Sequence, residues 1–230
     1  MKTFPMAVVA AFGLVASTAH ADVIDFTDSL PLTTTDWFQT LTVSQFDPTL
    51  GTLNSAKVSF SANMLSDMTL DNDNATPSPV VGNVSVQTFG TFAGIDLGLL
   101  LAADTGAPTV LAADDSGDTD LPGDGGADEI LVGNLTDNDM IMATLTAPGD
   151  LGQFLGAGTI STVNLFTLGG FGVTGGGGNV DVNVNTQAAA SLFVEYDFTP
   201  APPPPQIPVP ATLALLGLGL AGLGVARRRR

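Results

Sequence analysis

The stretch that decides the fold class reads NVDVNVN, at residues 179–185. Val180, Val182 and Val184 alternate there with asparagine and aspartate, and a second alternating run follows at residues 192–198. A period of two residues puts successive side chains on opposite faces of an extended chain. Both runs therefore predict strands with one buried face.

Further runs with strand-like patterns occur along the chain, at residues 37–46, 57–62, 80–89, 140–146 and 160–168. Segments rich in Gly, Pro, Asn or Asp separate them, at residues 47–51, 71–79, 114–128 and 169–178. Short strands divided by such turns indicate an antiparallel sandwich. We expect one all-β, jelly-roll-like body over residues 22–199, in which residues 93–113 form either a short helix or an apolar strand.

Charge and composition exclude several classes of function. All 23 acidic residues lie between Asp22 and Asp197, and Lys57 is the only basic residue in that stretch, which gives the body a charge of −22. That sign opposes binding to phosphate backbones, so we expect no nucleic-acid partner. The chain has no cysteine, and its single histidine is His20. A body without either residue lacks the usual thiol nucleophile, general base and soft metal ligands.

The N-terminus has the pattern of a secretory signal peptide over residues 1–21. One lysine precedes an apolar run at residues 4–16, and Ala19 and Ala21 flank His20 in an A-x-A cleavage site. The alternative is a membrane anchor, but the apolar run is short for a span. We expect the Sec translocon and signal peptidase to act here and to leave Asp22 as the first residue.

The C-terminus has three parts in order. Residues 200–210 are proline-rich, which favours a stiff polyproline II spacer. Residues 211–226 carry no charge and predict a transmembrane helix of about 24 Å. The four arginines that follow are expected to stay cytoplasmic, so that the body faces outward; they are Arg227, Arg228, Arg229 and Arg230.

This ending resembles the PEP-CTERM sorting signal of Gram-negative bacteria, in its VPLPA-type variant. The matching residues are Ile207, Pro208, Val209, Pro210 and Ala211. The resemblance implies recognition by an exosortase-like membrane enzyme, cleavage near the motif, and export to the cell surface or extracellular matrix. Val209 departs from the commonest form, which has glutamate, and this leaves the cognate enzyme open.

The body resembles the choice-of-anchor E domain of bacterial surface proteins. The matching stretches are residues 27–37, 46–53, 154–159, 177–179 and 194–198. The resemblance implies a secreted β-rich domain that carries no assigned activity, and it supplies no catalytic residues.

The acidic segment at residues 114–129 is the one candidate metal site. Closely spaced aspartates with glycine can supply the hard oxygens that calcium prefers. The candidate ligands are Asp118, Asp120, Asp124 and Glu129. In EF-hand register, Pro122 would fill a ligand position without a side-chain oxygen, so an EF-hand is excluded. An irregular calcium loop stays open, but we favour a solvated acidic loop and otherwise expect no cofactor.

Three further patterns are candidates for catalytic or cofactor sites. Residues 170–175 have the form G-x-G-x-x-G, but a dinucleotide site needs a following helix, and a valine-alternating strand follows instead. Glu129 and Glu195 are the only glutamates, and nothing in the sequence pairs them for glycoside hydrolysis. Lys57 could activate a serine, but its strand pattern places it toward solvent.

We therefore predict a non-enzymatic, exported cell-surface or matrix protein, tethered as a precursor in the inner membrane. Exopolysaccharide is a further expected partner, bridged to the acidic body by divalent cations. The alternatives are a calcium-dependent carbohydrate-binding or self-association module, and a carboxylate-based polysaccharide hydrolase.

Overall fold

The computed structural model describes residues 21–114 and 126–202, together with Leu220 and Arg227. Residues up to Pro200 form one compact unit, and the account that follows concerns that unit alone. Its elements are, in chain order, β1 (Asp22–Thr34), β2 (Phe38–Gln39), β3 (Thr42–Ser44), β4 (Gly51–Asn72), β5 (Ser78–Phe92), β6 (Ile95–Asp96), β7 (Leu99–Asp104), β8 (Thr109–Leu111), β9 (Glu129–Leu145), α1 (Pro148–Leu151), η1 (Gly152–Phe154), β10 (Thr159–Ser161), β11 (Val163–Gly175), η2 (Gly176–Gly178) and β12 (Val180–Pro200).

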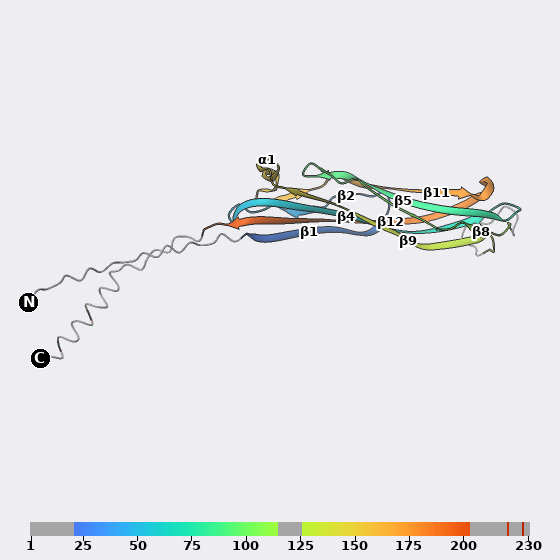
Figure 1. Ribbon diagram of the computed structural model, residues 1–230, viewed down its shortest axis with the longest axis horizontal. Helices are drawn as coiled ribbons and strands as arrows, with labels where there is room; N and C mark the ends of the chain where they lie inside the picture. Colours follow the sequence, from blue (N-terminus) through green and yellow to red (C-terminus); the bar gives the residue numbers. More distant parts are fainter. Residues whose placement is uncertain (1–20, 115–125, 203–219, 221–226, 228–230) are drawn as a thin grey trace, which may run out of the picture. The chain divides into compact units, whose positions relative to one another are not determined.

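Two antiparallel sheets make up the sandwich (Figure 1), and β3 and β10 form a separate two-stranded sheet. Sheet A has the order β1-β12-β4-β9. In sheet B, β5 lies between β11 and the short strands β6, β7 and β8, and β2 pairs with the other side of β11. With β1, β2, β4, β5, β7, β9, β11 and β12 numbered one to eight, the sheets have the order 1-8-3-6 and 2-7-4-5, the nested order of a jelly roll. The predicted antiparallel sandwich is confirmed.

Strands β4 and β12 form the centre of sheet A. They pair from Val180 opposite Asn72 to Pro200 opposite Gly51, with one shift of register between Asp197 and Phe198. The two alternating runs at residues 179–185 and 192–198 are thus parts of one strand. Alternate residues of both strands are buried against sheet B, which confirms the expected period of two.

Aromatic rings fill one part of the core around Tyr196. The rings of Phe26, Phe46 and Phe154 have centroids 5.9, 6.0 and 5.9 Å from that of Tyr196. The Tyr196 hydroxyl donates a hydrogen bond to the Ser44 carbonyl, at 2.9 Å. This bond satisfies the polar end of a fully buried side chain, as a packed interior requires.

The structure corrects the expected glycine-rich turn at residues 169–178. Residues as far as Gly175 belong to β11 and pair with β5, and the turn is confined to η2. Glycine is tolerated in this strand because the neighbouring side chains fill its space. An added Cβ at Gly170 would lie 3.1 Å from the Ser85 hydroxyl, and one at Gly172 would lie 3.0 Å from the Asn83 amide oxygen.

The structure resolves two segments for which the local sequence pattern was not decisive, residues 93–113 and β1. Residues 93–113 form the short strands β6, β7 and β8, so the apolar-strand alternative is the correct one and the helix is wrong. Strand β1 is absent from the predicted strands. Its alternation is interrupted because Val23 is exposed and because Asp28 takes the inward position between Phe26 and Leu30, which pack on the core.

No helix in the described ranges is long and apolar enough to cross a membrane. The predicted transmembrane segment, residues 211–226, lies outside the described residues except for Leu220.

We predict an anomalous titration of Tyr196, the only tyrosine of the chain. Burial raises the pKa of Tyr196 to about 12. An unfolded tyrosine titrates near pH 10, so the stability that the neutral hydroxyl contributes is complete below about pH 10 and is lost as the pH rises through about 12. Tyrosinate absorbance should show a midpoint near pH 12 in the folded protein and near pH 10 in denaturant.

The substitution Tyr196→Phe is the control for this titration. It should remove the absorbance change and flatten the decline of unfolding free energy across the same pH range. A midpoint near pH 10 in the folded protein would contradict the buried position of this side chain.

Candidate functional site

The two acidic segments of the sequence meet at one end of sheet A. The amide of Asn72 donates to the Asp128 carbonyl at 3.2 Å, and the amide of Asp114 donates to the Asn74 carbonyl at 2.8 Å. In the pairing of β4 with β9, Asp71 lies opposite Glu129. We call Asp71–Asn74, Asp114, Asp128 and Glu129 the acidic end.

Two asparagine side chains hold the acidic end together. The Asn72 amide group donates to the carbonyls of Thr76 and Ala112. The Asn74 amide group donates to the Asn72 side-chain oxygen at 2.7 Å and to the Asn179 carbonyl at 2.9 Å. Asn72 is fully buried, so its bonds to Thr76 and Ala112 replace the water that its amide group would otherwise bind.

The turn η2 closes this end because three successive glycines adopt positive φ. The values are 95° at Gly175, 72° at Gly176 and 64° at Gly177. A Cβ at Gly175 would collide with the Pro79 carbonyl, and one at Gly176 would collide with the Val180 side chain. The G-x-G-x-x-G pattern thus belongs to a strand and a tight turn that leads into β12, so a dinucleotide loop is excluded.

Only one of the four candidate calcium ligands can be placed. Glu129 is half-buried at the start of β9, whereas Asp118, Asp120 and Asp124 lie outside the described residues. Asp71 and Asp128 are buried close by, each 2% exposed. In the described part of the chain, no three His, Cys, Asp or Glu side chains gather as a metal site would require. Calcium binding stays a prediction.

Many aspartates instead close turns and strand ends by accepting backbone hydrogen bonds. Asp36 accepts from the Gly169 amide and Asp137 from the Ala102 amide, both at 2.9 Å. The Thr49 amide and hydroxyl, through their hydrogen bonds to Asp47, lower the pKa of that carboxyl. The carboxylates of these residues therefore have structural roles. The Asp-x-Thr spacing of a turn can reveal the role of Asp47 in a sequence, whereas Asp36 and Asp137 accept from amides far away in the chain.

The two glutamates lie far apart on sheet A. Glu195 faces Lys57 across the pairing of β12 with β4, whereas Glu129 faces Asp71. Residues 57 and 71 are 14 positions apart on one strand, which is about 45 Å. Glycosidase carboxylates lie about 5–10 Å apart, so Glu129 and Glu195 do not form a catalytic pair.

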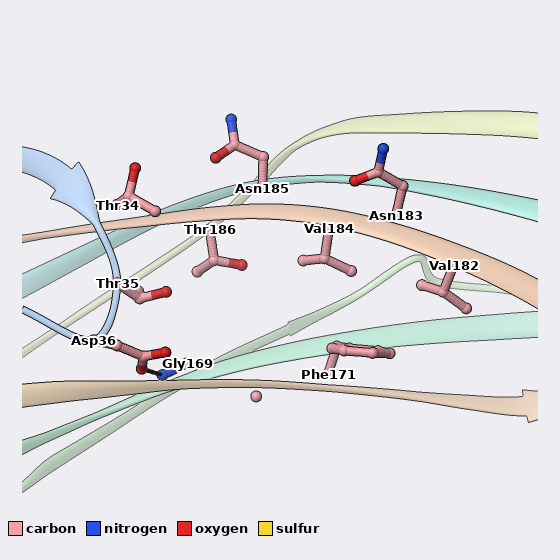
Figure 2. A pocket seen from close by; sticks show the side chains of 11 residues that line it. Thr34, Thr35, Asp36, Gly169, Phe171, Val182, Asn183, Val184, Asn185 and Thr186 are labelled. Atoms are coloured by element: carbon pink, nitrogen blue, oxygen red, sulfur yellow. Dashed lines mark hydrogen bonds between the residues drawn. The ribbon is translucent and has the colours of Figure 1, made fainter. Parts of the chain in front are cut away.

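A groove of about 410 Å³ opens between the two sheets, and the sequence did not predict it. Residues 34–36 form one end of it, residues 169–171 of β11 one wall, and residues 182–186 of β12 the other. Figure 2 shows Val182, Val184 and Thr186 pointing toward Phe171, while Asn183 and Asn185 point away. The groove arises because β1 ends at Thr34, opposite Gln187, while β12 extends to Val180.

The predicted processing residues lie at or beyond the ends of the described sandwich. Ala21 is exposed just before β1, and Asp22 is the first residue of that strand. Ala19 lies outside the described residues, as do residues 207–211 of the sorting motif. Of the four terminal arginines only Arg227 is described, as an exposed helical residue.

Comparison with protein families identifies a PEP-CTERM protein-sorting motif at residues 206–230. This confirms the resemblance of the C-terminus to that signal. The signal implies export, sorting to the surface or envelope, and an exosortase-type processing partner. The match covers the C-terminal segment alone, so the resemblance of the body to the choice-of-anchor E domain stays a prediction. No curated protein matches the chain in sequence.

Among solved structures, the chain is similar to one of the infectious bursal disease virus Gx strain, at 15% identity and a TM-score of 0.19. That similarity covers 94% of this chain and 55% of the other, so this chain spans about half of that protein. A structure of Desmodium yellow mottle tymovirus has 7% identity and a TM-score of 0.17, with 90% of this chain and 97% of the other covered. At these TM-scores neither similarity defines the fold.

We predict that Asn72→Ala destabilises the sandwich. The substitution removes the hydrogen bonds from a fully buried side chain to the Thr76 and Ala112 carbonyls, and the free energy of unfolding should fall by about 2 kcal/mol. Asn183→Ala is the matched control, because Asn183 is exposed, and should cost about 0.5 kcal/mol or less. Urea unfolding followed by the fluorescence of Trp37, the only tryptophan, measures both. Equal effects would contradict the role given to Asn72.

Proposed function

We propose that the chain is a non-enzymatic surface or matrix protein that is processed at both ends. The observation that carries the proposal is the sorting motif at residues 206–230, placed after a complete β-sandwich. A signal peptide directs the precursor to the Sec translocon. Residues 211–226 then hold it in the inner membrane until an exosortase-like enzyme cuts near the motif.

The positions of the first and last strands support this order of events. Cleavage after Ala21 would leave all of β1 in the mature chain, because that strand begins at Asp22. A cut between Pro208 and Ala211 would remove no strand, because β12 ends at Pro200. Both cuts therefore spare the buried core, which ends at Phe198.

The composition of the body supports a role outside catalysis. It carries 23 acids and a single lysine, and no histidine or cysteine follows His20. A charge of −22 keeps copies soluble and apart at low salt. Divalent cations would bridge such a surface to anionic polysaccharide, which is the partner expected in an extracellular matrix.

A calcium-dependent carbohydrate-binding or self-association module is the second candidate. The support for this candidate is the acidic end, where backbone hydrogen bonds join Asn72 to Asp128 and Asn74 to Asp114. Calorimetry of residues 22–200 with calcium tests it. Heat of binding and a raised melting temperature would support the module, whereas neither effect at millimolar calcium would remove it.

We predict that the motif prolines decide processing in the native bacterial host. The double substitution Pro208→Ala with Pro210→Ala should leave an unprocessed chain that ends at Arg230 and stays in the membrane fraction. The control is Pro203→Ala with Pro204→Ala, which makes the same chemical change in the spacer and should leave processing intact. Intact mass measured in membrane and medium fractions follows both variants.

Wild-type protein in the medium should start at Asp22 and end between Pro208 and Ala211, with or without added mass. If the wild-type chain still ends at Arg230, the C-terminus is an anchor and the proposed processing is wrong. If both double variants are blocked alike, the spacer and not the motif determines recognition.

A further inference from the structure

The N-terminal part of β12 is an open sheet edge. Strand β1 pairs with β12 only at residues 187–198, and its last contact is the bond from the Thr35 amide to the Thr186 carbonyl, at 3.0 Å. Alternate residues of a strand direct both backbone groups to the same side. Because the Thr186 carbonyl points toward the β1 side, Val180, Val182 and Val184 present their amides and carbonyls there. No strand of residues 21–114 or 126–202 pairs with them.

Strand β11 is open on the side that faces the same groove. Strand β2 pairs with it at Leu165 and Phe166 only. Beyond these pairs, the Trp37 carbonyl accepts a hydrogen bond from the Thr167 amide at 3.1 Å. The Asp36 carboxylate accepts one from the Gly169 amide. The backbone groups of Phe171 and Val173 then point to the open side, where no described strand meets them.

The groove between the two open edges has an apolar lining. Phe171 is 60% exposed and faces the side chains of Val182 and Val184 (Figure 2). Alternating apolar side chains together with free backbone donors and acceptors are what an added β-strand needs.

Two other edge strands, β1 and β9, carry protective residues. The outer edge of β1 carries Asp25 and Pro31, with an irregularity between Leu30 and Thr33. Strand β9 carries Asp137 and Asp139, and the former caps the Ala102 amide of β7. Charges, proline and bulges are the devices that prevent edge-to-edge pairing.

The open edges have almost none of these devices. Residues 180–186 contain one charged residue, Asp181, and neither lysine nor proline. Residues 169–175 of β11 contain no charged residue at all. This contrast within one protein indicates that the open edges are sites of pairing.

We propose that the open edge of β12 pairs with the same edge of a second copy, antiparallel about a two-fold axis. With Val182 of both copies on the axis, Val180 meets Val184 of the second copy and all facing backbone groups find partners. Asp181 then lies opposite Asn183 of the second copy, whose amide can donate to the carboxylate. No like charges meet, and this complementarity favours a second copy over a foreign strand.

The same axis brings the β11 edges of the two copies together, because both open edges border one groove. The glycines at positions 169, 170 and 172 leave room for this approach. The inference goes beyond export and sorting, since it concerns how the mature protein assembles.

Net charge gives the pairing an unusual salt dependence. Each body carries −22, so two copies repel each other at low ionic strength. Added salt screens this repulsion without weakening backbone hydrogen bonds. Dimerisation should therefore strengthen as monovalent salt increases.

The test uses residues 22–200, which contain every strand and every buried core residue of the described chain. Val182→Pro removes one open-edge amide of each copy, an amide that pairs with no strand in the described part of the monomer. Thr27→Pro is the matched control, because the Thr27 amide points outward from the protected edge of β1. Sedimentation equilibrium at low and high sodium chloride, with chelator present, measures association of each variant.

We expect a monomer–dimer equilibrium that tightens with salt. Val182→Pro should weaken the dimer by about tenfold or more, because the change removes a hydrogen bond at each symmetric position. Thr27→Pro should dimerise like the wild type, and circular dichroism should show both variants folded.

Three outcomes would overturn the proposal. One is a monomer at all salt concentrations, which would leave a foreign strand as the occupant of the groove. Another is equal dimerisation of the two proline variants. The third is a dimer that forms only with calcium, which would place the contact at the acidic end. None of these outcomes bears on sorting, which the processing experiment tests separately.

Discussion

The rest of the structure depends on the long antiparallel pairing of β4 with β12. All 21 residues of β12 have a partner on β4. Strands β1 and β9 add to the two sides of this pair, and its inner face supplies Phe60, Leu192 and Tyr196 to the core. This pairing ends at Pro200, so every strand of the sandwich precedes the sorting motif at residues 206–230 in the chain.

Alternation of polar and apolar residues in the sequence predicts half-buried strands. It does not predict a strand whose formation depends on pairing with a distant part of the chain. Residues 179–185 and 192–198 were separate predictions because Thr186 and the three alanines between them hide the period. They form one strand because β4 continues beside them. The glycines of β11 are turn formers by composition, yet pairing with β5 extends them as a strand. Local preference and long-range pairing conflict there, and the pairing prevails.

The candidate sites were predictable to different degrees. Composition alone marks residues 71–74 and 114–129 as unusual, and the C-terminal motif is visible in its short signature. The meeting of the two acidic segments depends on the register of β4 with β9, which no local pattern contains. The open groove is less predictable still. It exists because β1 ends at Thr34 while β12 runs seven residues farther, a difference between two strands that lie more than 140 residues apart in the chain.

The choice of aspartate over glutamate explains how so acidic a body remains stable. Aspartate makes up 21 of the 23 acids, and its short side chain can reach nearby backbone amides. Asp28, Asp36, Asp96 and Asp104 each accept such a bond, so part of the negative charge also fixes loops and strand ends. These carboxylates repel other copies of the protein over most of its surface. Charged residues are few along the open edges of β11 and β12, so repulsion between copies is weak there, beside backbone groups of residues 180–184 that pair with no described strand on that side.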